Sequence, residues 1–185
     1  TLDRTKEIHK LLQIFEPDAV LTENIWGYLW GKLAYGAMLF ATALNNDSMA
    51  DNFADQHRTK LWIAIGREVM GLATRKGIQP LGFNGFDPIA YLPGATDSEA
   101  QTSVKEMAEF NRMSAKTHSG IWRDLAVRKR KTEVTEQLGI LVELANEVDF
   151  DAPLIKLIID LIHDVENGQR EMSSETFAVL LDRCE

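Results

Sequence analysis

Two ionisable residues, far apart in the chain, are the first candidates for chemistry. Lys32 lies in the sequence Trp-Gly-Lys-Leu at 30–33, and Glu133 lies in Lys-Thr-Glu-Val at 131–134. A lysine ammonium can donate a proton to a carbonyl oxygen when burial lowers its pKa towards the working pH, and a carboxylate can orient a hydroxyl. The pair suits the reduction of a keto acid if the fold brings the two side chains into one site.

Both residues also have a purely structural explanation, which the sequence leaves open. Lysines in apolar helices usually extend to solvent, and an acid in the first turn of a helix, where we expect Glu133, is favoured by the helix dipole alone. Gly27, Gly31 and Gly36 fall in the same expected helix as Lys32, where each costs about 1 kcal/mol relative to alanine. They therefore indicate close approach either of another backbone or of a ligand.

Composition narrows the classes of protein that this chain can represent. It has 185 residues, 45% of them hydrophobic and 26% charged, as in a folded globular protein of one domain or a small pair. Its net charge of −8 repels nucleic acid and anionic membranes, so we expect neither as a partner. The basic run at 128–131 is either a solvated patch or a local anion site. We read no signal peptide and no transmembrane run, and we expect a cytoplasmic protein.

Spacings of the common metal-binding and catalytic motifs are missing. The four histidines show neither HExxH nor Glu-x-x-His spacing, and Cys184 is the single cysteine. Asp160 and His163 share a helix face, but one such pair is weak support for a metal, and we expect none. There is no Walker loop, no Gly-x-Ser-x-Gly elbow and no Gly-x-Gly-x-x-Gly turn. The chain cannot bind a dinucleotide by the usual route on its own.

Apolar residues recur at helical spacing along the chain and predict an all-α domain. We expect a first helix that ends before Pro17 and a long apolar helix, carrying Lys32, from a cap at Thr22 to about residue 44. A helix capped by Asp97 or Ser98 should run to about residue 116. Further helices are expected at about 48–53, 55–75, 132–148, 152–166 and 174–182. Residues 78–94 are rich in proline and glycine and predict a loop with at most one helical turn at 88–91.

Four segments resemble, in order and spacing, the C-terminal domain of ketopantoate reductases. They are Trp-Gly-Lys-Leu at 30–33, Ser-Gly-Ile-Trp-Arg-Asp at 119–124, Lys-Thr-Glu-Val at 131–134, and Pro153 before a helix ending near Glu166. The resemblance implies a multi-helix domain of the 6-phosphogluconate dehydrogenase C-terminal type. Residues 1–185 would then form a single helical substrate and dimerisation domain. The N-terminal Rossmann domain that binds NADPH would be absent from this chain, which starts at Thr1 without a methionine and resembles a piece of a longer protein.

The resemblance also implies roles for individual residues. Lys32 matches the catalytic lysine that protonates the keto oxygen, and Glu133 matches the acid that holds the substrate and the lysine in place. Ser119 or Gly120 falls at the substrate-binding serine, and Asp124 belongs to the same motif.

At two positions the chain departs from the family pattern. The family has asparagines four and eight residues after the lysine, where this chain has Gly36 and Phe40. Both changes remove amides that would bind the substrate. The resemblance therefore implies a reaction class, the reduction of a 2-keto acid, more directly than it implies ketopantoate as the substrate.

Two functions follow from these expectations. The first is the substrate-binding domain of an NADPH-dependent 2-keto acid reductase that resembles ketopantoate reductase, an enzyme of pantothenate biosynthesis. Such a domain would form a homodimer and would be inactive without its Rossmann domain. The second is a catalytically inactive helical module for dimerisation or binding. The loss of the asparagines favours the second function, whereas Lys32, Asp124 and Glu133 favour the first.

Overall fold

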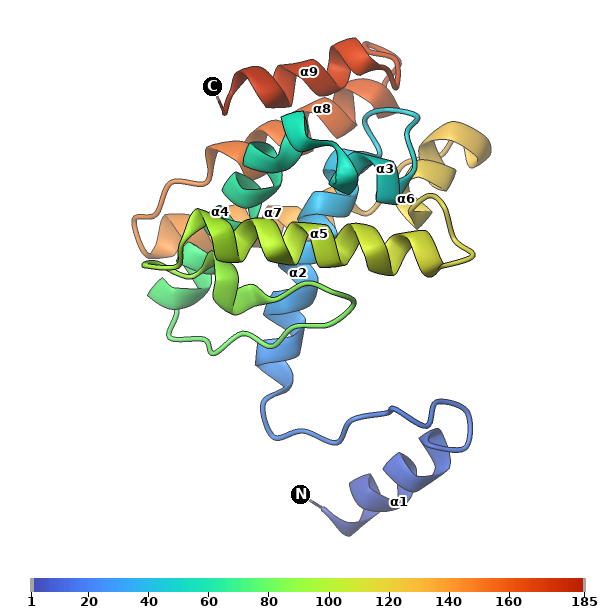
Figure 1. Ribbon diagram of the computed structural model, residues 1–185, viewed down its shortest axis with the longest axis vertical. Coiled ribbons are helices and arrows are strands. Elements are labelled where there is room, and N and C mark those ends of the chain that lie inside the picture. The colour runs from blue at the N-terminus through green and yellow to red at the C-terminus, as the bar shows by residue number, and fades with distance from the viewer. Residues whose placement is uncertain (1, 185) are drawn as a thin grey trace.

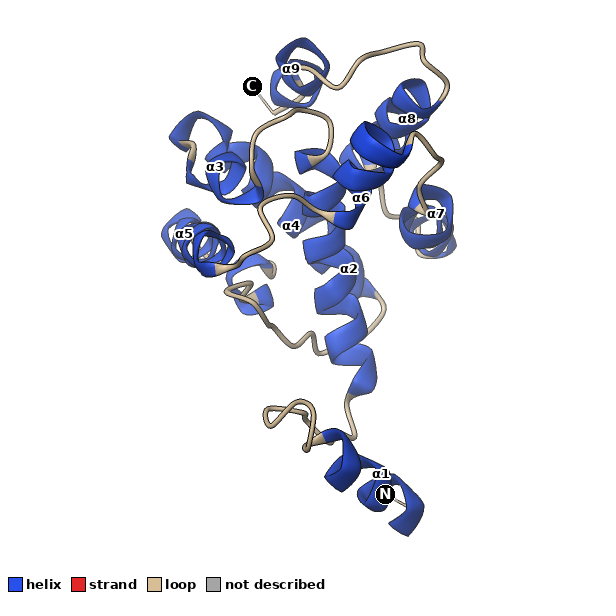
Figure 2. Cartoon of the chain, turned by 90° about the vertical axis from the view of Figure 1, so that its right-hand side faces the viewer, coloured by secondary structure: helices blue, strands red, loops and turns tan. Residues whose placement is uncertain are grey.

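The computed structural model describes residues 2–184, and these form helices joined by loops, without a β-strand (Figure 2). The all-α prediction is confirmed. In chain order the α-helices are α1 (Asp3–Leu12), α2 (Ile25–Thr42), α3 (Met49–Ala54), α4 (Thr59–Arg75), α5 (Asp97–Met113), α6 (Gly120–Arg123), α7 (Val134–Glu147), α8 (Pro153–Glu166) and α9 (Ser174–Asp182). Two 3₁₀ turns, η1 (Gln56–Arg58) and η2 (Pro88–Tyr91), precede α4 and α5, and a π-helical turn, η3 (Asp124–Arg128), continues α6.

Helix α2 runs through the main body and packs against α4, α7 and α8 (Figure 1). Its central residues Ala34, Ala37 and Met38 have no exposed surface, which explains why its sequence is apolar on nearly every side. The loop after α4 lies against its first turns, where a Cβ atom at Gly27 or Gly31 would overlap the backbone oxygen of Gln79 or Leu81. Two of the three helical glycines therefore allow close approach of another backbone.

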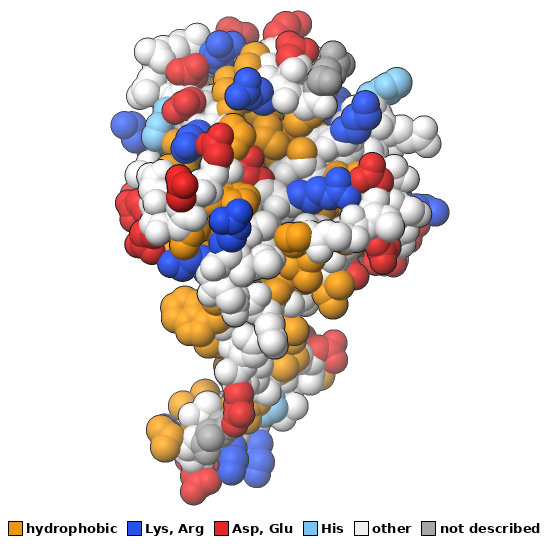
Figure 3. Space-filling view, turned by 90° about the vertical axis from the view of Figure 1, so that its left-hand side faces the viewer, with side chains coloured by type: hydrophobic (Ala, Val, Ile, Leu, Met, Phe, Trp, Pro, Cys, Tyr) orange, Lys and Arg blue, Asp and Glu red, His pale blue; other side chains and the backbone are white. Residues whose placement is uncertain are grey.

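Helix α1 lies apart from the main body at one end of the molecule (Figure 1). None of its residues is buried, and a hydrogen bond of 2.7 Å between His9 Nε2 and the Ala19 oxygen holds the loop behind it. Hydrophobic side chains are exposed on this helix and on the narrow neck that leads to the body (Figure 3). They include Ile8, Leu11, Leu12, Ile14 and Phe15.

Several helix ends differ from the expected positions by a few residues. Helix α2 is capped by Asn24, whose side chain accepts a hydrogen bond from Gly27 N, while Thr22 supports that cap by accepting from Asn24 N. Thr96 caps α5 in a capping box with Glu99, so neither Asp97 nor Ser98 is the cap. Each of these segments holds neighbouring side chains that are able to cap. The local box with Glu99 selects Thr96, whereas a contact of Asn24 with the loop after α4 selects Asn24.

A buried polar network fastens the turn between α2 and α3. Asn45 and Asn52 exchange two hydrogen bonds of 2.9 and 3.1 Å between their side-chain amides, and both are almost wholly buried. Arg58 donates to Asn52 Oδ1 at 2.7 Å and to Asp47 Oδ2 at 2.7 Å. Each of these four side chains therefore has a partner inside the network.

A carboxylate from α4 caps helix α8. Glu68 accepts hydrogen bonds from Leu154 N at 3.0 Å and Ile155 N at 2.8 Å, the first free amides after Pro153. Burial nevertheless raises the pKa of Glu68 above its usual value, and the two amide bonds reduce that shift. The contact fixes α8 against α4, and both helices pack against α2.

Candidate active site

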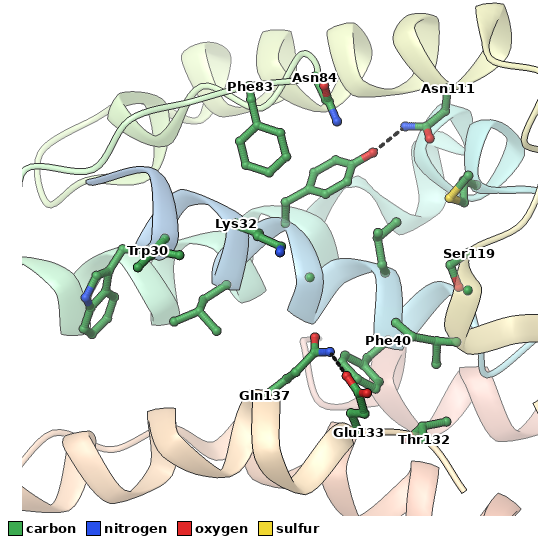
Figure 4. Close-up of a pocket in the computed structure, with 18 of the residues that line it drawn as sticks. Trp30, Lys32, Phe40, Phe83, Asn84, Asn111, Ser119, Thr132, Glu133 and Gln137 are labelled. Atoms are coloured by element: carbon green, nitrogen blue, oxygen red, sulfur yellow. Dashed lines mark hydrogen bonds between the residues drawn. The ribbon is translucent and has the colours of Figure 1, made fainter. Parts of the chain in front are cut away.

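A cavity of about 980 Å³ opens along the middle of α2 (Figure 4). The loop before η2 and helix α5 border it on one side, and helices α6 and α7 border it on the other. Five residues that the sequence predicts as site residues line this one space: Lys32, Ser119, Gly120, Asp124 and Glu133. The fold thus brings together side chains from three distant segments.

Lys32 extends from α2 into the cavity (Figure 4). Its side chain is exposed, and within residues 2–184 no hydrogen bond or ion pair engages its ammonium group. The backbone beside it is held by the loop packed on Gly31. Lys32 is therefore an exposed cation that lines the cavity and is not buried, as the solvent-exposed alternative predicts.

Glu133 lies on the opposite wall of the cavity, at the cap position before α7 (Figure 4). The sequence places it in the first turn of this helix, but the helix begins one residue later. Gln137 Nε2 donates to Glu133 Oε2 at 2.9 Å. Thr132, next to it, gives its backbone N–H and its hydroxyl to Glu166 Oε1 at 2.6 and 2.7 Å. These bonds tie the turn to α8 and fix where the Glu133 carboxylate projects.

Ser119 and Gly120 begin the short helix α6. Ser119 is buried, and its Oγ accepts a hydrogen bond from Trp122 N at 3.0 Å as the helix cap. That bond leaves the hydroxyl hydrogen of Ser119 able to donate. At Gly120 an added Cβ would meet no atom within 4 Å, so the backbone is open to the cavity. The Ser119 hydroxyl can therefore donate to a ligand, and the missing side chain of Gly120 leaves room for one.

The carboxylate of Asp124 already has two partners. It pairs with Arg128 Nη1 at 2.8 Å and with Arg130 Nε at 3.0 Å, and its side chain is only 17% exposed. The hydrogen bond from Arg130, followed by that from Arg128, holds the pKa of Asp124 below its usual range. In this arrangement Asp124 shapes the end of η3 as well as lining the cavity.

Sequence reasoning missed three polar residues on the wall opposite Glu133. Asn111 donates from Nδ2 to the Tyr35 hydroxyl at 2.8 Å and to the Met107 oxygen at 2.8 Å, while Asn84 points into the cavity from a turn where its φ is +55° (Figure 4). Burial raises the pKa of Tyr35, so its hydroxyl keeps its proton. Tyr35 lies three residues after Lys32, a helical spacing that could have placed both on one face. No local signal marks Asn84 or Asn111.

The positions of the two family asparagines lie on the cavity floor. An added Cβ at Gly36 would meet no atom within 4 Å, in contrast to Gly27 and Gly31. Phe40 is fully buried and contributes its ring to the wall. Of the three glycines in α2, only Gly36 opens space for a ligand.

Within residues 2–184, no group of three or more His, Cys, Asp or Glu side chains is placed to hold a metal ion. Among the same residues, no helix combines the length and the apolar character needed to cross a membrane.

Fold and cavity together define a helical domain in which a lysine and a carboxylate line one cavity. The family model described as ketopantoate reductase PanE/ApbA C terminal matches residues 24–166, and the chain belongs to this family. The match starts at the cap of α2, ends with α8 and contains every residue that lines the cavity. The family implies an N-terminal Rossmann domain as a partner. Neither the curated proteins nor the solved structures provide a match to this chain.

Proposed function

We propose that this chain is the substrate domain of an NADPH-dependent 2-keto acid reductase that works with an N-terminal Rossmann domain. The observation that carries the proposal is Lys32, a cation without a protein partner in residues 2–184, which extends into a cavity whose far wall holds Glu133. Unpaired ionisable groups that converge on a cavity are typical of sites that bind and convert a ligand. The soluble, cytoplasmic setting expected from the sequence remains a prediction.

Lys32 would act as the proton donor. Its ammonium would hydrogen-bond the keto oxygen of the substrate and protonate it as the carbonyl becomes an alcohol. Glu133, held by Gln137, would accept a hydrogen bond from the substrate or from the lysine and keep the two in register. The positive charge of Lys32 would also attract the substrate carboxylate in a chain of net charge −8.

Residues at the rim of the cavity fit a nucleotide that another domain brings. When bound, reduced nicotinamide supplies a hydride to the keto carbon. Trp26 and Leu29, on the first turns of α2, line the cavity and are 65% and 40% exposed, so they would offer apolar surface to its ring. The chain has no Gly-x-Gly-x-x-Gly turn for the phosphates, so the Rossmann domain would hold the rest of the cofactor.

Replacing Lys32 in the full-length enzyme tests the proposal. Lys32→Ala should lower kcat by about 10²–10⁴-fold, the usual contribution of a general acid, with an unchanged thermal unfolding midpoint. Lys60→Ala is the matched control, because Lys60 is an exposed helical lysine outside the cavity. NADPH oxidation at saturating 2-keto acid gives the rate. Equal rates for the wild type and Lys32→Ala would refute the role of Lys32.

A helical dimerisation or binding module is the second candidate. It is favoured by the exposed apolar side chains of α1 and the neck, which a monomer of residues 2–184 leaves uncovered. A homodimer or the N-terminal domain would cover this surface. The Lys32 experiment separates the candidates, since a binding module would show no NADPH oxidation in either the wild type or Lys32→Ala.

A further inference from the structure

Apolar side chains line one strip of the cavity, along α2. Polar groups border the cavity around Lys32 and also beyond it, where Asn111, Ser119 and Thr132 lie towards the Phe40 end (Figure 4). On α2 itself, Tyr35 carries a hydroxyl, and the other residues after Lys32 that line the cavity have no polar side-chain group: Leu33, Gly36, Leu39 and Phe40. The α2 wall of the cavity is therefore apolar from one turn past the lysine.

Apolar residues from other parts of the fold also line the cavity. They come from α3, the loop before η2, α6 and α7, and they are Met49, Phe83, Ile121, Ile140 and Leu144. Most are only partly buried, so they expose apolar surface towards the space. Gly36 enlarges that space, because an added Cβ there meets no atom within 4 Å.

We infer that the preferred substrate is a 2-keto acid whose tail is bulky and apolar, such as an aryl or long branched alkyl group, seated over Gly36. This inference rests on the proposed function and adds the substrate class. The side chains of Leu33, Leu39 and Phe40 cannot pair with a tail hydroxyl, whereas an aryl tail packed on them would remove apolar surface from water on both molecules. A volume of about 980 Å³ is also at the upper end of the range for small-molecule sites.

Comparing two substrates of the full-length enzyme tests the inference. The value of kcat/KM with NADPH should be at least about tenfold higher for phenylpyruvate than for ketopantoate, which carries a hydroxyl on its tail. Gly36→Asn would place an amide in the space for the tail. It should lower kcat/KM for phenylpyruvate by about 10–200-fold and that for pyruvate, which has no bulky tail, by less than about threefold.

Gly139→Asn provides the matched control. Gly139 is a helical glycine of α7 that does not line the cavity, and an added Cβ there meets only Thr135 Cγ2 at 3.8 Å. The control should leave the ratio of kcat/KM for the two substrates unchanged. Thermal unfolding of each variant verifies folding, and if Gly36→Asn does not fold, the preference of the wild type decides.

The outcomes separate this inference from the proposed function. A tenfold preference for ketopantoate, together with loss of turnover in Lys32→Ala, would overturn the apolar tail and leave the reductase proposal intact. Equal losses for phenylpyruvate and pyruvate in a folded Gly36→Asn variant would also overturn it. Absence of turnover with every 2-keto acid would reject the reductase and, with it, the substrate class.

Discussion

Two polar regions near α2 differ in how completely their side chains are paired. In the network at the turn between α2 and α3, Asn52 donates to the Asn45 side chain and to the backbone oxygens of Asp47 and Ser48. It accepts from Asn45 and Arg58. In the cavity, Lys32 has no partner among the residues that the structure describes. The named side chains of the first region are all paired with one another, whereas the second region keeps the charge of Lys32 unpaired.

This difference separates groups that hold the fold from groups available for function. Buried polar groups need partners because an unsatisfied one costs about 1–3 kcal/mol, so a saturated network contributes to stability. A solvated group that points into a cavity contributes little to stability and can bind a ligand instead. The glycines show the same division, since Gly31 allows backbone contact while Gly36 leaves open space.

The largest expected effect on stability belongs to the network. Asn52→Ala removes the amide at its centre and leaves Asn45 and Arg58 without their buried partner, so the free energy of unfolding should fall by about 2–4 kcal/mol. Urea denaturation followed by circular dichroism measures this change. Asn146→Ala in α7 is the control, because Asn146 is exposed and the change there should stay within about 0.5 kcal/mol. Similar small losses in both variants would break the distinction between the two regions.

Most of the fold could be predicted because the helices bury continuous apolar faces. The single turn at η2 (Pro88–Tyr91) and helix α9 (Ser174–Asp182) have the predicted residues. Caps were less predictable, since Thr22 and Asn24 are both good capping residues and only the contact between Asn24 Nδ2 and the Gln79 oxygen, at 2.9 Å, favours the second. A contact across so many residues leaves no local pattern.

The site was predictable only where the family motif covers it. Lys32 and Glu133 stand in the motif segments, and the structure places both on one cavity, while their catalytic roles remain predictions. Asn84 and Asn111 come from a loop and from α5, and no spacing in the sequence relates them to Lys32. Asn84 reads locally as a turn residue before Gly85, so its position in the cavity follows from tertiary packing alone.

The Glu68 cap of α8 is a second group that is paired inside the protein, and pH tests its contribution to stability. Glu68→Gln leaves one acceptor for two α8 amides and should cost about 1–2 kcal/mol at pH 8. Because burial raises its pKa above the usual 4.5, the folded protein binds more protons than the unfolded chain just above that pH. The wild type should therefore gain stability over the variant as pH falls from 8 towards 4.5. Urea unfolding of both proteins at several pH values measures the gap, and a gap that narrows on acidification would contradict the raised pKa.

The smallest expected effect concerns Asp124, which both lines the cavity and pairs with Arg128 and Arg130. Asp124→Asn should cost at most about 1 kcal/mol at pH 7, because ion pairs near the surface are screened by solvent. Its pKa is lowered in the fold, so this stability is present above the unfolded pKa of about 3.9 and is lost as pH falls below it, opposite in sign to Glu68.

Kinetics on the same variant then show whether Asp124 is a structural group or a group that binds substrate. If the two arginines saturate its carboxylate, KM for the 2-keto acid in the full-length enzyme should change by less than about threefold, the size of an ordinary surface substitution. A tenfold rise in KM with unchanged unfolding would show instead that the carboxylate binds substrate, as the family motif implies. Asp124 would then belong with Lys32, and pairing inside the protein would no longer separate structural groups from functional ones.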